Sequence, residues 1–189
     1  MTGPALARLT YSEYLALERA STVKHEYVDG AAIAMAGGSI EHGRLATRLA
    51  WLVQRGLEGR PCDTFGSDVR VRTPNGSAYY PDLTIVCGHL ERDAEDAETI
   101  TNPAVIVEVL SDSTESRDRT TKFRQYRRLP SLREYVLVSQ DDPFVEVWRR
   151  ESGRWALAQE VGRGATFRLE AADVEIAVDE LYRDPLATA

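Results

Sequence analysis

Hydrophobic and polar positions along this chain follow two different periods, which predict where its helices and strands lie. Between residues 39 and 58, apolar side chains recur every three or four positions, as on the buried face of a helix. They are Leu45, Leu49, Leu52, Val53 and Leu57. The spacing predicts a helix over these residues that ends near Gly59.

Two shorter runs are apolar at nearly every position, which is typical of strands buried on both faces. They are Leu83–Cys87 and Val105–Leu110. Glu108 interrupts the second run, and Asp82 directly precedes the first. Burying an ionised carboxylate is costly unless a cation, a metal or several donors compensate for it. These two acidic residues are therefore the first candidates for chemistry.

The rest of the pattern predicts a mixture of helices and strands. Asp29-Gly30, between two short strand-like runs in residues 25–36, is typical of a hairpin turn. Further helices are expected at 12–20, with Ser12 as the N-cap, at 115–129 and near 178–182, and further strands at 62–65, 68–72, 134–138, 144–149 and 155–161. This order predicts an α/β fold with a central mixed β-sheet flanked by helices.

Length and composition indicate a single domain over residues 1–189, with a core at about 10–160. No apolar run approaches the roughly 18 residues of a membrane span, and the first residues do not resemble a signal peptide. We therefore expect a cytoplasmic protein with no membrane partner. Cys62 and Cys87 form no CxxC pair, so buried free thiols are expected rather than a disulfide or a zinc site. Trp51, Trp148 and Trp155 are expected to pack.

Charge is distributed unevenly along the chain. The net charge of −7 argues against a general nucleic-acid coat, because affinity for a polyanion comes largely from neutralised phosphates. Residues 117–133, however, hold seven basic residues and a single acid, Asp118. The acids gather instead at 91–98 and 173–184. A local basic face therefore remains compatible with a nuclease.

The two strand carboxylates are able to converge. Residues two apart on a strand share a face, so Glu108 lies with Ile106 and Leu110, and Asp82 lies with Thr84. If the two strands are neighbours, both carboxylates reach one point. Two carboxylates with several waters suit Mg²⁺ or Mn²⁺, which prefer hard oxygen ligands.

A cation for the same site is expected on the helix that follows the second strand. At about 100° per residue, Lys122 lies roughly 40° from Tyr126 and falls within the arc that faces the sheet. A merely solvated lysine would lie on the opposite side. Arg119 falls within the same arc and could supply the charge instead.

Pro81-Asp82 together with Glu108-Val109-Leu110 resembles the motif of the restriction-endonuclease-like superfamily, the PD-(D/E)xK nucleases. Over residues 10–150 the chain is more closely similar to the bacterial Uma-two family of restriction-endonuclease-like proteins. The residues that carry this similarity are Glu26-Tyr27-Val28-Asp29-Gly30, His42, Ser111, Thr114, Asp118, Lys122, Tyr126 and Glu134-Tyr135. The resemblance implies a restriction-endonuclease-like fold. It also implies that Lys122 replaces the motif's lysine, whose position Leu110 occupies.

We therefore interpret Asp82, Glu108 and Lys122 as catalytic candidates, the first two also as metal ligands, with Glu26 and His42 as secondary candidates. The expected activity is Mg²⁺- or Mn²⁺-dependent endonucleolytic hydrolysis of DNA. A homodimer would suit the cutting of both strands.

Two other interpretations remain open. One is a catalytically inactive nuclease-fold module that binds or regulates a partner, in which Glu108 is only a buried ion-pair residue. The other is a carboxylate-pair hydrolase acting on something other than nucleic acid. No G-x-S-x-G elbow, P-loop or G-x-G-x-x-G motif is present, which argues against esterase, nucleoside-triphosphatase and dinucleotide-binding functions.

Overall fold

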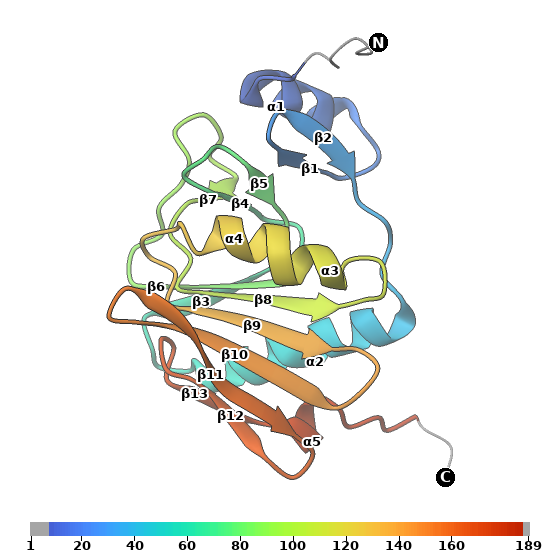
Figure 1. The fold of residues 1–189 in the computed structure, drawn as a ribbon, viewed down its shortest axis with the longest axis vertical. Helices are drawn as coiled ribbons and strands as arrows, with labels where there is room; N and C mark the ends of the chain where they lie inside the picture. Colours follow the sequence, from blue (N-terminus) through green and yellow to red (C-terminus); the bar gives the residue numbers. More distant parts are fainter. Residues whose placement is uncertain (1–7, 187–189) are drawn as a thin grey trace.

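The computed structural model describes residues 8–186 and is organised around a six-stranded sheet (Figure 1). Its strand order is β11-β10-β9-β8-β6-β3. The strands are β3 (Cys62–Gly66), β6 (Leu83–Cys87), β8 (Val105–Leu110), β9 (Glu134–Ser139), β10 (Phe144–Glu151) and β11 (Arg154–Gly162). The pair β8–β9 is parallel and the other neighbours are antiparallel, which confirms the predicted mixed sheet.

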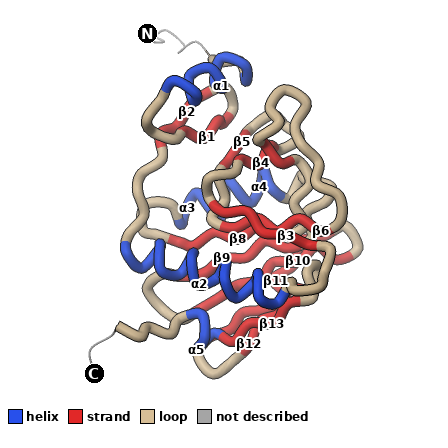
Figure 2. Tube along the Cα trace, turned by 180° about the vertical axis from the view of Figure 1, so that it is seen from behind, coloured by secondary structure: helices blue, strands red, loops and turns tan. Residues whose placement is uncertain are grey.

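Helix α2 (Ile40–Gly56) covers one face of this sheet, together with the hairpin of β12 (Thr166–Leu169) and β13 (Val174–Ala177) and the short α5 (Val178–Leu181) (Figure 2). The predicted apolar stripe of α2 is buried against the residues of β8 that face it. Ser39 caps the helix, because its Oγ accepts a hydrogen bond from the His42 N–H at 3.0 Å. This cap fixes the first turn of α2, where His42 lies.

A second helical segment covers the opposite face. It consists of α3 (Glu115–Arg117), the π-helical η1 (Asp118–Lys122) and α4 (Phe123–Tyr126). The sequence predicted one regular helix here; the structure contains instead a wide π turn in its middle. Tyr126 and Leu129 pack against Ile106 and Leu110 of β8. Glu108 lies between those two strand residues and therefore faces this helical segment.

A smaller sheet, in the order β2-β1-β5-β4-β7, packs beside the helical segment under α1 (Tyr11–Ala20). Its strands are β1 (His25–Val28), β2 (Ala31–Ala34), β4 (Arg70–Arg72), β5 (Ala78–Tyr79) and β7 (Thr99–Ile100). The predicted turn between β1 and β2 is confirmed, with positive φ at Asp29 (49°) and Gly30 (89°). The N-cap of α1 is Thr10, not Ser12, because Thr10 forms a capping box with Glu13.

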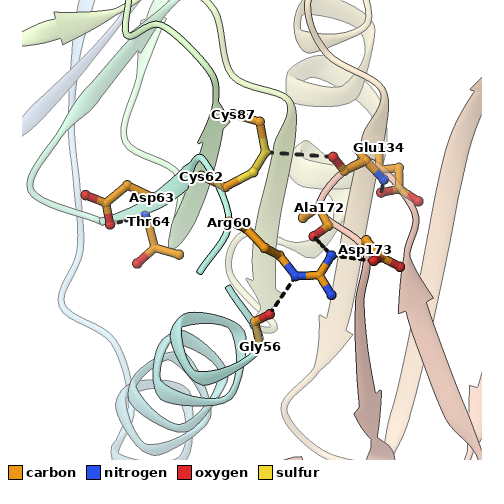
Figure 3. The surroundings of a disulfide bond; sticks show 10 residues. Gly56, Arg60, Cys62, Asp63, Thr64, Cys87, Glu134, Ala172 and Asp173 are labelled. Atoms are coloured by element: carbon orange, nitrogen blue, oxygen red, sulfur yellow. Dashed lines mark hydrogen bonds and ion pairs between the residues drawn. A yellow bond between two sulfur atoms is a disulfide. The ribbon is translucent and has the colours of Figure 1, made fainter. Parts of the chain in front are cut away.

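Two packing predictions are wrong. Cys62 and Cys87 form a disulfide (Figure 3), because the antiparallel register of β3 and β6 places them directly opposite each other. Their separation of 25 residues gave no sign of this pairing. Trp51 is 52% exposed on the outer side of α2, where the Arg55 guanidinium stacks on its ring at 4.6 Å. Trp148 and Trp155 do pack, both against Phe123.

Within residues 8–186, no helix is long and apolar enough to cross a membrane. The cytoplasmic location stays a prediction, and the disulfide removes the free thiols that accompanied it.

Candidate active site

The register of β6 and β8 brings the two strand carboxylates together. Leu83 pairs with Val107 in this antiparallel ladder, so the next position along places Asp82 opposite Glu108. Asp82 is tied to β8 directly, since its Oδ2 accepts the Val109 N–H at 2.7 Å. The expected arrangement on neighbouring strands is thus the one the structure has.

Glu108 is 2% exposed and receives two donors from the helical segment. The Lys122 ammonium and the Tyr126 hydroxyl both donate to its Oε1, each at 3.1 Å. The helical spacing predicted that Lys122 and Tyr126 share one face. This is confirmed, because the residues between them are α-helical. The contact between Lys122 and Glu108 is direct.

Two further carboxylates surround the same ammonium. Asp118 Oδ1 lies 3.0 Å from Lys122 Nζ, and Glu26 Oε1 of β1 lies 3.3 Å from it. Arg117 pairs with the other oxygen of Glu26. One buried ammonium is therefore shared by three buried carboxylates that come from three different elements.

His42 completes the wall of the site from α2. Its Nε2 lies 3.1 Å from Asp82 Oδ2. Gly38 permits this placement, because a Cβ on it would come within 2.9 Å of the His42 ring nitrogen. His42 is thus positioned to orient Asp82.

All five sequence candidates line one cavity of about 230 Å³. They are Glu26, His42, Asp82, Glu108 and Lys122. The same cavity is bordered by the β2–α2 loop and by the loop that leads from β8 to α3. The carboxylates of Glu26, Glu108 and Asp118 are nearly fully buried in its wall.

The electrostatics of the cluster favour uptake of positive charge. Burial raises the pKa of Glu108 well above its ordinary value; Lys122 opposes this, while Asp118, Asp82 and Glu26 add to it. Burial also raises the pKa of Asp118. For Lys122, burial lowers the pKa, but the three carboxylates outweigh it and the ammonium stays protonated. The hydrogen bond to Asp82 raises the pKa of His42.

The donor chemistry of this cluster fits a hard divalent cation. Both oxygens of Glu26 and Oδ1 of Asp118 are buried without a well-directed hydrogen bond, and their contacts are the ion pairs to Lys122 and Arg117. Within residues 8–186, no group of three or more His, Cys, Asp or Glu side chains is arranged to hold a metal ion. The fit therefore rests on the carboxylate pair Asp82 and Glu108, with water as the expected further ligand.

Comparison with known proteins decides the family. Residues 11–179 match the model of the Uma2 family, described as "Putative restriction endonuclease". The chain belongs to the Uma2 family. Two curated relatives come from Synechocystis sp.: "Uncharacterized protein slr1290", 37% identical over 93% of this chain and 92% of its own length, and "Uncharacterized protein sll1609", 35% identical over 83% and 90%.

The fold of this Uma2 protein is also similar to a crystal structure described as "a putative nuclease belonging to DUF820" from Anabaena variabilis. The TM-score is 0.75 with 16% identity, and the match covers 92% of this chain and 97% of that one. At this identity the likeness bears on the fold alone. It agrees with the restriction-endonuclease-like α/β architecture expected from the sequence.

Arg119, the alternative to Lys122, points elsewhere in this Uma2 structure. Its guanidinium pairs with Glu115 at 2.7 Å and with Glu146 at 2.7 Å. The π turn lies between Arg119 and Tyr126, so the regular helical arithmetic that grouped them fails there. Lys122 is therefore the cation that the fold brings to Glu108.

Sequence reasoning did not assign Asp118 and Arg117 to the site. Asp118 precedes Lys122 by one helical turn, a spacing that brings side chains together, and this signal could have identified it. Arg117 had no such signal, because it contacts Glu26 of the smaller sheet. Only the packing of the two sheets reveals it.

Lysine is rare in this chain, which makes its presence at position 122 notable. The chain has 23 basic residues, of which only Lys24 and Lys122 are lysines. A compact ammonium fits among three converging carboxylates, whereas a planar guanidinium requires a broader, forked set of acceptors. The lysine is thus matched to the shape of the cluster.

Proposed function

We propose that this Uma2 protein is a divalent-metal-dependent endonuclease that hydrolyses DNA phosphodiester bonds. The observation that carries the proposal is the buried Lys122 ammonium held against Glu108, beside Asp82, in the wall of a cavity. Membership of the family described as "Putative restriction endonuclease" supports DNA as the substrate.

Asp82 and Glu108 are the residues that would hold Mg²⁺ or Mn²⁺. When bound, such an ion polarises a phosphate oxygen and lowers the pKa of a coordinated water. Burial, and to a lesser degree the neighbouring carboxylates, raise the pKa values of Glu108 and Asp118. A cation bound beside them would stabilise their charged forms, which supports a metal at this site.

The roles of the other residues follow from their contacts. Lys122 would stabilise the negative charge that grows on the phosphate in the transition state. Tyr126 holds the Glu108 carboxylate from the buried side, and His42 holds Asp82. Both are positioning residues. A homodimer, which would place two sites on a duplex, stays a prediction.

A plasmid-nicking assay tests the proposal. Wild type should nick supercoiled DNA with Mg²⁺ or Mn²⁺ and should lose the activity in EDTA. Glu108→Gln should be inactive at equal protein concentration. The matched control is Asp93→Asn, which neutralises a carboxylate outside the site, on a loop residue paired with Arg72, and it should retain activity.

One observation favours a second candidate, a nuclease-fold interaction module. The part of the chain that the structure describes has no preformed three-ligand metal group. Absence of cleavage with every divalent metal tested, in a folded wild type, would favour that module over the nuclease.

A further inference from the structure

A separate pocket of about 660 Å³ lies where the helical segment ends. It is lined by Arg127, Arg128, Arg150, Gly153, Arg154 and Trp155. The first two follow α4, and the others belong to the β10–β11 hairpin. None of the candidate active-site residues takes part in it. The fold thus gathers four arginines from two distant stretches of sequence.

Three of these arginines have side chains without a partner among the described residues. Within residues 8–186, the exposed side chains of Arg127, Arg128 and Arg154 form no ion pair and no hydrogen bond. Elsewhere arginines meet carboxylates, as in the pairs Arg70–Asp96 and Arg149–Glu134, and the Arg60–Asp173 pair of Figure 3. The positive charge of the pocket is therefore free for a ligand.

Arg150 gives the pocket a fixed shape. Its guanidinium donates to the carbonyl oxygens of Leu129 at 2.9 Å and Pro130 at 3.1 Å, and also to that of Arg127. These bonds hold the end of α4 against β10. The same guanidinium lies over the Trp155 ring at 5.1 Å.

Trp155 lines the pocket, and Glu151 lies beside Arg150 at the end of β10. The indole N–H of Trp155 is buried and has no hydrogen-bond acceptor. Glu151 at the end of β10 is the acid nearest in sequence to the arginines of the hairpin, and it forms no ion pair within the described residues. The pocket is therefore strongly positive in a chain whose net charge is −7.

Two further arginines lie on segments that border the pocket. Arg124 on α4 and Arg133 before β9 are also exposed, and their side chains have no partner within the described residues. Guanidinium groups match phosphate oxygens with pairs of parallel hydrogen bonds. Several such groups on neighbouring segments suit a polyanion with many phosphates better than one small anion.

We propose that this arginine pocket binds the phosphate backbone of a nucleic acid. The inference rests on the proposed function only in naming nucleic acid as the source of the phosphates. It adds a contact site that is separate from the carboxylate cluster and that carries no sequence information, because backbone contacts position a duplex without reading its bases.

Binding of a fluorescently labelled DNA duplex, measured by anisotropy in EDTA, tests the proposal without cleavage. The variant is Arg127→Gln/Arg128→Gln, and the matched control is Arg19→Gln/Arg183→Gln, which removes the same charge from exposed positions elsewhere. The pocket variant should bind about tenfold more weakly, and the slope of log affinity against log salt should shrink by about 1.8, or 0.9 per lost phosphate contact. The control should stay within about twofold of wild type.

Equal loss in both variants, or no binding by wild type, would overturn the inference. So would displacement of the duplex by millimolar orthophosphate at constant ionic strength, since that result indicates a small-anion site. If no metal supports cleavage but the pocket variant still loses binding, only the proposed function fails.

Discussion

Two buried clusters of charge in this protein use opposite designs. On β4, the Arg70 guanidinium pairs with Asp96 at 2.6 Å and also donates to Thr99 and to Tyr80. In the candidate active site, the single ammonium of Lys122 is shared among three carboxylates. Burial raises the pKa of Asp96, but Thr99 and Arg70 outweigh it and the pKa falls below its ordinary value. The pKa of Glu108 is raised.

The difference separates a structural ion pair from a site prepared for a ligand. Arginine offers five donors, enough to satisfy Asp96 and its neighbours, so the charged forms are stabilised within the protein. Lys122 offers three donors to three carboxylates, and among the described residues only Glu26 has a second cation, Arg117, so the acceptors of this cluster outnumber its donors. A cluster with unmet acceptors gains more from an added cation than one that is already satisfied.

The largest expected effect is on stability, in the β4 cluster. Asp96→Asn leaves the Arg70 guanidinium without its carboxylate and should lower the free energy of unfolding by about 3–5 kcal/mol. Asp118→Asn should change it by less than about 1 kcal/mol, because Lys122 keeps two other carboxylates. Urea denaturation of both variants checks the contrast. Equal losses would show that the two clusters have the same structural role.

The next effect is on activity, in the site cluster. Lys122→Met keeps the apolar stem but removes the charge, and it should slow cleavage by about 10²-fold, the cost of losing one transition-state donor. Metal binding should survive, since an ammonium is not a ligand. Arg119→Met is the control, because Arg119 contacts Glu115 and Glu146 instead. If Arg119→Met cleaved DNA more slowly while Lys122→Met cleaved at the wild-type rate, the catalytic cation would be Arg119 and not Lys122.

The smallest effect is on pH dependence, and its sign differs between the clusters. The raised pKa of Glu108 means that the folded protein keeps this proton to a higher pH than the unfolded chain does. The resulting contribution to folding stability is present below the unfolded pKa and is lost as pH rises through the folded pKa. The lowered pKa of Asp96 gives a contribution that is present above its unfolded pKa and is lost as pH falls through the folded value.

Thermal unfolding without metal checks these signs. As the pH rises from 5 to 8, wild type should lose stability relative to Glu108→Gln. His42 titrates in both proteins, so its effect cancels in this difference. An advantage of wild type that grows with pH over that range would contradict the raised pKa of Glu108.

The central sheet and its carboxylates were predictable from the sequence because the signal is local. The strands of Asp82 and Glu108 are apolar runs, and their pairing follows once they are neighbours. Lys122 was predictable from helical geometry because the path to Tyr126 is regular. The disulfide, by contrast, depends on the register of β3 against β6, which no local pattern encodes.

Other parts of the site depend on tertiary packing and were not predictable in this way. Arg117 reaches Glu26 only because the smaller sheet packs beside the helical segment. The π turn at residues 118–122 changes the direction of Arg119, and no glycine or proline within it marks the irregularity. The arginine pocket likewise forms only when the β10–β11 hairpin meets the end of α4.

The measurement that tests the central claim most directly is a calorimetric titration with Mn²⁺ near neutral pH. The control is Asp93→Asn, which removes a carboxylate that is paired with Arg72 outside the site. This variant should bind Mn²⁺ with the same affinity as wild type. Asp82→Asn and Glu108→Gln should each bind at least about tenfold more weakly, as expected for the loss of a ligand from a site of two protein carboxylates. Equal Mn²⁺ binding by all four proteins, or none by folded wild type, would contradict a metal site at Asp82 and Glu108.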